Sequence, residues 1–219
     1  MKITVNIPEK LSDITLEQYQ RFLKVAEAED VDDVFLMQKM IQIFCGVKLT
    51  DVFYFKIQDV RNVINEINQV LLEEPKFQQR FSFEGVEYGF IPNLDDISFG
   101  EYIDLDENMN SWDSMHKAMS VLYRPIEMEK GERYTIKKYD GVDNEETMKK
   151  TPVDIALGAS VFFYNLRREL QRAILKFSSD QMEELTSQQR EILLQNGVGF
   201  NHYILSLREI LGDLEISQN

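Results

Sequence analysis

The sequence predicts a mostly α fold of the α+β class: a compact helical body with a β-hairpin, an N-terminal strand and a short extended arm. Three observations predict it. Apolar residues recur at helical spacing over most of the 219 residues. Between residues 81 and 90 they alternate instead, around a Glu84-Gly85 turn. No Ser-, Gly- or Pro-rich linker divides the chain. We therefore expect one domain over 1–219, with a loop or arm at 126–150.

The first elements follow from local signals. Residues 3–7 alternate between apolar and polar, which predicts a strand ended by Pro8. Thr15 and Gln18 have the spacing of a capping box and open a helix to about residue 26. A second helix is expected over about 32–45, where Gly46 suits the C-terminal end. A third is expected over about 58–73, before Pro75.

Beyond the hairpin, helices dominate again. Ser98 and Glu101 form a second capping-box pattern, which predicts a helix to about residue 108. Another is expected over 112–123, stopped by Arg124-Pro125. Tyr134 and Ile136 suggest one short strand in the irregular region that follows. Later helices are expected over three ranges: 152–177, 180–196 and 200–211.

Composition excludes several classes of protein. With 24 basic and 38 acidic residues the net charge is −14, and such a chain repels phosphate backbones. We therefore expect no sequence-specific nucleic-acid binding. One cysteine, Cys45, cannot form an intrachain disulfide. The longest apolar run, 155–164, is about half of the roughly 20 residues that a membrane span needs. The N-terminus has no leader pattern, so a soluble protein made in the cytosol is expected.

The chemistry-bearing residues do not form a recognisable site. His116 and His202 have no metal-ligand spacing, and Cys45 lies on a predicted apolar helix face. His116 is expected at a helix surface or boundary. The run from Asp104 to Asn110 resembles the start of a calcium loop, but methionines stand where the glycine and the bidentate glutamate are required. We therefore predict a non-enzyme with no catalytic, cofactor or metal site.

Charge is segregated along the chain. Residues 81–116 contain nine acids and no Lys or Arg, whereas residues 117–176 are rich in cations. Identical subunits meeting head to tail can pair such stretches across a heterologous contact. The candidate interface residues are Asp95, Asp96, Asp104, Asp106, Lys137, Lys138, Arg168 and Arg172. The alternative is a solvated acidic surface, with cations placed to suit a helix C-terminus. Aromatic residues are also dense over 81–102, and most are expected in the core.

An ordered set of segments carries a family resemblance. The segments are ITLEQYQRFLK, GVEYGFIPNLDDISFGEYIDLDE, WDSMHKAMSVLYRPI, a Y-x-I-x-x-Y stretch and TPVDIALGASVFFYNLRREL. In this order, over about residues 12–172, they resemble small structural proteins from the virion-assembly regions of tailed phages, including crAss-like phages of Bacteroidetes. The family supplies no active-site residues to carry over.

The resemblance implies a virion protein made in the host bacterial cytoplasm. The first expectation is a ring-forming protein of the head–tail connector or tail, whose partners are other copies of itself and neighbouring portal or tail proteins. The alternative is a tail-assembly chaperone that is absent from the mature virion.

Overall fold

The computed structural model describes residues 5–29, 32–131 and 133–184 of the chain. Helices predominate, and four strands form one antiparallel sheet, which confirms the predicted mostly α, α+β class. Internal contacts divide the chain into two units, residues 1–161 and 162–219, and the single domain expected over 1–219 stays a prediction. Among the α8 side chains that the structure describes, Ala159 is the last buried one.

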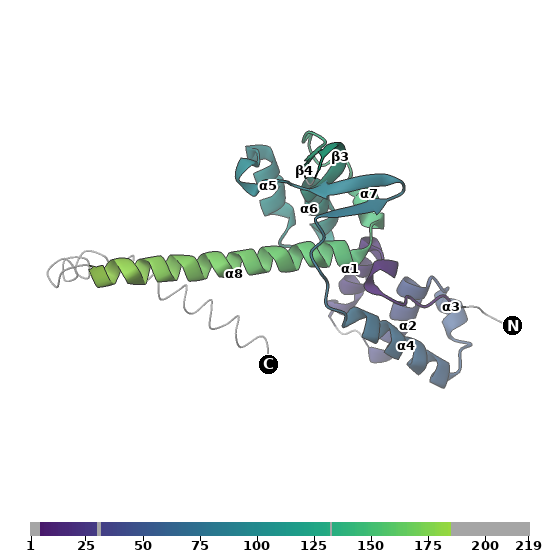
Figure 1. The fold of residues 1–219 in the computed structure, drawn as a ribbon. Coiled ribbons are helices and arrows are strands. Elements are labelled where there is room, and N and C mark those ends of the chain that lie inside the picture. The colour runs from purple at the N-terminus through teal and green to yellow at the C-terminus, as the bar shows by residue number, and fades with distance from the viewer. Residues whose placement is uncertain (1–4, 30–31, 132, 185–219) are drawn as a thin grey trace. The chain divides into compact units, whose positions relative to one another are not determined.

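The elements of the first unit follow one another with short connections (Figure 1). The helices are α1 (Leu16–Ala26), α2 (Asp33–Cys45), α3 (Leu49–Val52), α4 (Ile57–Leu71), α5 (Phe99–Asn108), α6 (Met115–Leu122) and α7 (Glu145–Lys150). The strands are β1 (Arg80–Phe83), β2 (Val86–Phe90), β3 (Tyr123–Lys130) and β4 (Arg133–Ile136). The last helix, α8 (Val153–Glu184), begins in this unit.

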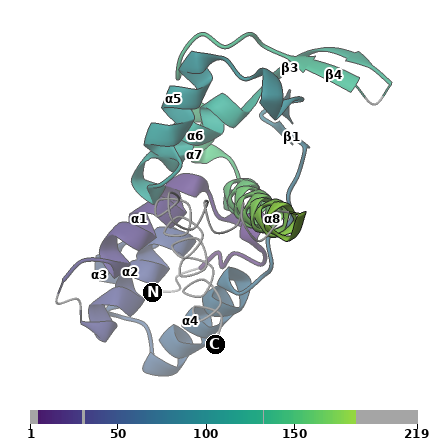
Figure 2. The same ribbon diagram turned by 90° about the vertical axis from the view of Figure 1, so that its left-hand side faces the viewer.

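The N-terminal helices form the first part of the core. Helix α2 packs against α1, α3 and α4, and Figure 2 shows these helices gathered together. Leu16, Ile41 and Ile67 are fully buried there. The predicted start of α1 is confirmed: the Thr15 hydroxyl accepts from the Gln18 backbone, and the Gln18 side chain accepts from the Thr15 backbone. The predicted glycine also ends α2, since Gly46 has a φ of 66°.

The predicted N-terminal strand does not form over the described residues 5–7. Val5 and Ile7 are half-buried and Asn6 is exposed, so the alternation of burial is present. These residues have no hydrogen-bonded strand beside them in the described chain. Alternation shows which side chains face inward, but a strand also needs a partner backbone.

The sheet has the strand order β1-β2-β3-β4, with every pair antiparallel. The predicted hairpin is confirmed, since Glu84 and Gly85 both have positive φ at its turn. One face of the sheet buries an aromatic cluster: Phe81, Tyr88, Phe90 and Tyr123, with ring centroids 5.2 to 5.3 Å apart. On Gly89 a Cβ would lie 2.3 Å from the Tyr134 ring, so only glycine admits that ring.

Residues 126–150 are not the arm that the sequence predicts. Strand β3 begins at Tyr123, directly after α6, and forms a hairpin with β4 through Gly131. Helix α6 ends at Leu122, just before Arg124-Pro125, as expected. Pro125 then lies within strand β3, because residues 123–125 pair with β2. Helix α7 occupies 145–150, so among the described residues of this range Gly131 and residues 137–144 lie outside helix and strand.

Helix α8 begins where the sequence predicts and packs tightly at its start. Val153 donates its backbone N–H to the Ile14 carbonyl, and Leu16 donates to the Thr151 carbonyl. A Cβ on Gly158 would lie 2.4 Å from the Lys76 carbonyl oxygen, so this glycine permits close approach of a backbone segment.

The helix continues to Glu184, beyond the expected end near residue 177. No proline or glycine interrupts residues 177–184, so no residue in that stretch forces a stop. The predicted helix over 180–196 therefore has its first residues within α8. The rest of it and the helix over 200–211 lie outside the described residues.

The described part of the second unit is the portion of α8 from Phe162 onward. The Phe162 and Phe163 rings lie edge to face, with centroids 5.3 Å apart. Tyr164 and Leu166 are exposed. In the described chain, no helix combines the length and apolar character that crossing a membrane requires.

Candidate functional site

Helix α5 presents an apolar stripe to solvent. The apolar side chains on this face are Phe99, Tyr102 and Ile103, which are 78%, 54% and 38% exposed. The spacing i, i+3, i+4 places all three on one helix face, and Asp106 and Glu107 continue that face by one more turn. We call these five residues the α5 stripe. Exposed aromatic groups of this kind on a helix are typical of protein-binding surfaces.

The opposite face of α5 is fixed by a buried ion pair. The Arg124 Nη2 atom donates to Glu101 Oε1 at 2.5 Å, and each side chain is only 8% exposed. The other Glu101 oxygen accepts from the Ser98 backbone at 2.7 Å and so caps the helix. Burial acts to raise the pKa of the Glu101 carboxyl, but the Ser98 hydrogen bonds and the Arg124 charge outweigh it and lower that pKa. Glu101 therefore stays ionised.

Tyr139 lies in the segment after β4 and contacts the same helix. Its ring lies against Gly100, where a Cβ would be 3.2 Å from the ring. Its hydroxyl donates to the Asp104 carboxylate, and the Arg124 guanidinium lies 5.7 Å from the ring centroid. Burial and the Asp104 hydrogen bond raise the pKa of Tyr139 to about 12, so the phenol keeps its proton for this bond.

These contacts determine which way α5 faces. Glu101 and Leu105 are buried, and Asp104 is tied to Tyr139, so the stripe must point outward. A surface held in this way loses little conformational entropy when a partner binds.

The acidic end of the stripe has no cation of its own. Asp106 and Glu107 form no ion pair within the described residues, and the last turn of α5 contains no basic residue. Negative charge near a helix C-terminus is unfavourable, because the helix dipole is negative there. A cation supplied by another molecule would therefore be stabilising at this end.

The predicted interface residues lie in four places, of which α5 carries Asp104 and Asp106. Asp95 and Asp96 are exposed in a 3₁₀ turn (Leu94–Asp96), where Asn93 donates to Asp96 at 2.6 Å. Lys137 forms an ion pair with Asp143 at 2.7 Å, and Lys138 is exposed.

Arg168 and Arg172 lie on α8, half-buried and exposed respectively. Neither forms an ion pair within the described residues.

Two side-chain contacts of α5 join the acidic stretch to the cation-rich stretch within one chain. These are the Glu101–Arg124 ion pair and the Asp104–Tyr139 hydrogen bond, which brings Asp104 beside the segment that contains Lys137 and Lys138. Asp104 is thus engaged internally, whereas Asp106 on the same helix is not. Pairing of the remaining residues between subunits stays a prediction.

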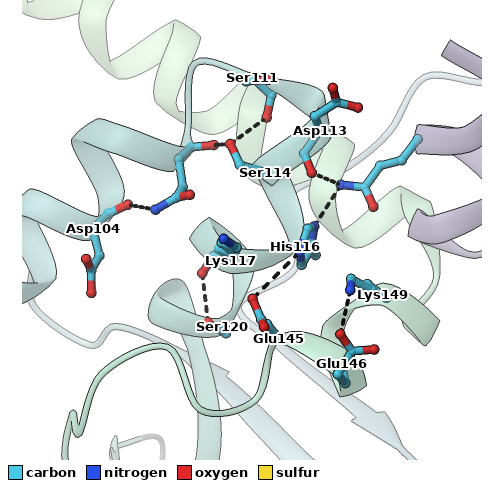
Figure 3. A network of polar contacts seen from close by, with 12 residues as sticks. Asp104, Ser111, Asp113, Ser114, His116, Lys117, Ser120, Glu145, Glu146 and Lys149 are labelled. Carbon is cyan, nitrogen blue, oxygen red and sulfur yellow. Dashed lines mark hydrogen bonds and ion pairs between the residues drawn. The ribbon is translucent and has the colours of Figure 1, made fainter. Parts of the chain in front are cut away.

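A second polar network surrounds His116, which links three helices (Figure 3). Gln20 of α1 donates to the Trp112 carbonyl at 2.5 Å and lies 3.0 Å from His116 Nδ1, while His116 Nε2 is 3.8 Å from a Glu145 oxygen. The expected surface or boundary position is wrong, because His116 is only 7% exposed. Burial, reinforced by the Lys149 charge, lowers the pKa of His116, and Glu145 only partly opposes this. A neutral, hydrogen-bonded imidazole fits a structural role here.

Sequence reasoning missed the α5 stripe. Most of the aromatic residues over 81–102 are expected in the core, and that expectation does not single out Phe99 and Tyr102, which are both exposed. The Ser98–Glu101 capping box does locate the helix and so fixes the spacing of its faces. Which face is buried depends on Arg124 and Tyr139, which lie far along the chain.

Two further surfaces expose large apolar groups. Phe53, Tyr54 and Ile57 are 68%, 84% and 64% exposed at the corner between α3 and α4. Residues of the β3–β4 hairpin line a shallow groove of about 620 Å³, which includes Met128 and Tyr134. Met128 is itself 68% exposed.

Within the described chain, no group of three or more His, Cys, Asp or Glu side chains is placed to hold a metal ion. No protein-family model, curated protein or solved structure matches the chain.

Proposed function

We propose that the chain is a structural subunit of a tailed-phage virion, a ring-forming protein of the head–tail connector or tail. The observation that carries the proposal is the α5 stripe, which exposes three apolar side chains on a helix whose orientation is fixed by a buried ion pair. An exposed apolar surface on a rigid support is suited to binding a neighbouring subunit.

The charge of the chain supports the connector placement. At −14 the subunit repels a phosphate backbone, so a channel formed by such subunits would neither grip nor stall DNA passing through it. The resemblance to phage structural proteins over residues 12–172 supports the assignment to a virion.

One observation favours a second function, a tail-assembly chaperone. The groove on the β3–β4 hairpin is bordered by exposed Met128 and by β4, a strand at the edge of the sheet. Methionine adapts to varied apolar partners, and a free strand edge can pair with an extended segment. Such a surface suits temporary binding of an apolar segment of a tail protein.

Quantitative mass spectrometry of purified virions, from a phage whose genome encodes the chain, distinguishes the two functions. A connector or tail subunit is expected at a fixed copy number, in a constant ratio to the portal protein. A chaperone is expected in infected-cell lysate and not in purified particles. Absence from virions therefore contradicts the structural proposal.

A further inference from the structure

Helix α8 carries a stripe that mirrors the one on α5. Val161 and Tyr164 are exposed, and Arg168 and Arg172 follow on the same helix face at i+7 and i+11 from Val161. We call these four residues the α8 stripe. Apolar side chains come first along its helix and cations come second.

The two stripes are complementary in order as well as in kind. Along α5, Phe99, Tyr102 and Ile103 come first, and the carboxylates of Asp106 and Glu107 come second. Two helices lying side by side in parallel would place apolar groups against apolar groups and the two carboxylates beside the arginines. The antiparallel arrangement would place each charged end against an apolar one.

We propose that the α5 stripe of one copy binds the α8 stripe of a second copy, with the two helices parallel. This inference names the subunit contact of the structural protein proposed above, and so it rests on that proposal. The contact is heterologous, because each copy offers one stripe and receives the other.

Charge identifies the occupant of the α5 stripe as the α8 stripe. Cations on a partner can pair with Asp106 and Glu107, which form no ion pair within the described chain. The two other surfaces described above mix cations with acids and so offer no net positive charge: Lys48 and Lys56 with Asp51 and Asp59 at the α3–α4 corner, and Lys130 and Arg133 with Glu127 and Glu129 on the β3–β4 hairpin. The α8 stripe contains two arginines and no acid.

The proposed contact has an apolar part and a charged part, which behave differently. The apolar residues supply most of the affinity, and the charges set register and rate of encounter. Exposed ion pairs are weak and are screened by salt. Self-association is therefore expected to weaken moderately as salt increases, without being abolished.

Sedimentation velocity of the full chain over a range of concentrations tests the proposal. The wild-type chain is expected to form larger species as concentration rises. Reversal of both acids, Asp106→Lys with Glu107→Lys, is expected to weaken association about three- to tenfold, because two rim charges then repel the arginines. Reversal of both arginines, Arg168→Glu with Arg172→Glu, is expected to have a similar effect.

The combination of all four changes is the decisive variant. It restores opposite charges across the contact, so association is expected to return to within about threefold of wild type. The matched control is Glu29→Lys with Glu66→Lys, which changes net charge by the same amount at exposed acids outside the stripe. The control is expected to associate at least as well as wild type.

The apolar part has its own pair of variants. Tyr102→Ser on α5 is expected to weaken association more than tenfold, since aromatic groups at the centre of an interface dominate affinity. Tyr54→Ser removes an equally large, more exposed ring at the α3–α4 corner and is expected to have no effect. Circular dichroism of each variant checks that the monomer remains folded.

Three results overturn the inference: a chain that stays monomeric at every concentration, a four-residue variant no better than either double variant, or equal effects of Tyr102→Ser and Tyr54→Ser. These outcomes leave the proposed function standing if the protein is found in virions. A self-associating chain that is absent from virions overturns the proposed function instead.

Discussion

At the scale of residues, the Arg124–Glu101 ion pair is the contact on which the candidate site depends. Both side chains are 8% exposed, and Glu101 also caps α5. Arg124→Met leaves the Glu101 charge buried without its partner. We expect this variant to lose about 3–5 kcal/mol of unfolding free energy, as measured by urea denaturation.

A second substitution distinguishes a buried charge from lost packing. Glu101→Gln keeps an oxygen for the Ser98 backbone while removing the charge. The double variant Arg124→Met, Glu101→Gln is therefore expected to recover at least about 1 kcal/mol relative to Arg124→Met alone. No recovery would mean that packing of the guanidinium, and not its charge, stabilises α5.

His116 makes the stability of the fold depend on pH. Burial lowers its pKa in the folded protein, so the unfolded chain binds a proton more readily as pH falls through the ordinary histidine range near 6.5. Stability from the neutral imidazole is present above that range and is lost below it. We expect the urea concentration at the unfolding midpoint to decrease as the pH is lowered from about 7 to about 5.

His116→Asn isolates this effect, because its amide oxygen replaces Nδ1 as the acceptor for Gln20 without titrating. The variant is expected to show a flatter pH dependence than wild type over the same interval. Identical slopes for the two proteins would assign the pH dependence to carboxylates elsewhere.

At the scale of elements, Gly158 tests how α8 begins. Alanine favours helix over glycine by about 1 kcal/mol, so Gly158→Ala would stabilise an isolated helix. In the fold its Cβ would lie 2.4 Å from the Lys76 carbonyl oxygen, which is backbone and cannot rotate away. We expect a net loss of about 1–3 kcal/mol in unfolding free energy.

Asn165→Ala provides the control on the same helix. Its side chain is exposed, so only the gain in helix propensity is expected there, within about 0.5 kcal/mol. A Gly158→Ala protein as stable as wild type would show that the segment at Lys76 can move away from α8.

The elements that the sequence predicts well are set by neighbours along the chain. Both capping boxes, the Gly46 end of α2 and the Glu84-Gly85 turn form as predicted, since each rests on residues within four positions. Strand β3 was missed because its identity depends on pairing of residues 123–125 with β2, more than thirty positions away. Arg124-Pro125 alone is typical of a helix stop.

The same difference between local and long-range signals explains which parts of the candidate site the sequence predicts. The helix that carries the α5 stripe was predicted, along with Asp104 and Asp106 as candidate residues. Its orientation was not, because a buried Glu101 and an exposed Phe99 reverse the usual preference of their side chains. Arg124 and Tyr139 impose that reversal from 23 and 38 positions further along the chain.

At the scale of the whole molecule, charge and apolar surface have different distributions. The chain has a net charge of −14, yet its described surface exposes large apolar groups, among them those of the α5 stripe, the α3–α4 corner and the β3–β4 hairpin. A strongly charged surface keeps a protein soluble, and apolar patches on such a surface mark where it binds others. The central claim is that the α5 stripe is covered by a neighbouring subunit in the assembled particle.

Hydroxyl-radical footprinting of purified virions, compared with the isolated chain at low concentration, tests that claim most directly. Phe99 and Tyr102 both react with the radical when exposed, and Tyr54 reports on the α3–α4 corner in the same experiment. We predict that oxidation of Phe99 and Tyr102 falls about tenfold in the virion, as expected for residues buried at the centre of an interface. Unchanged oxidation of both residues in virions that contain the protein would contradict the account.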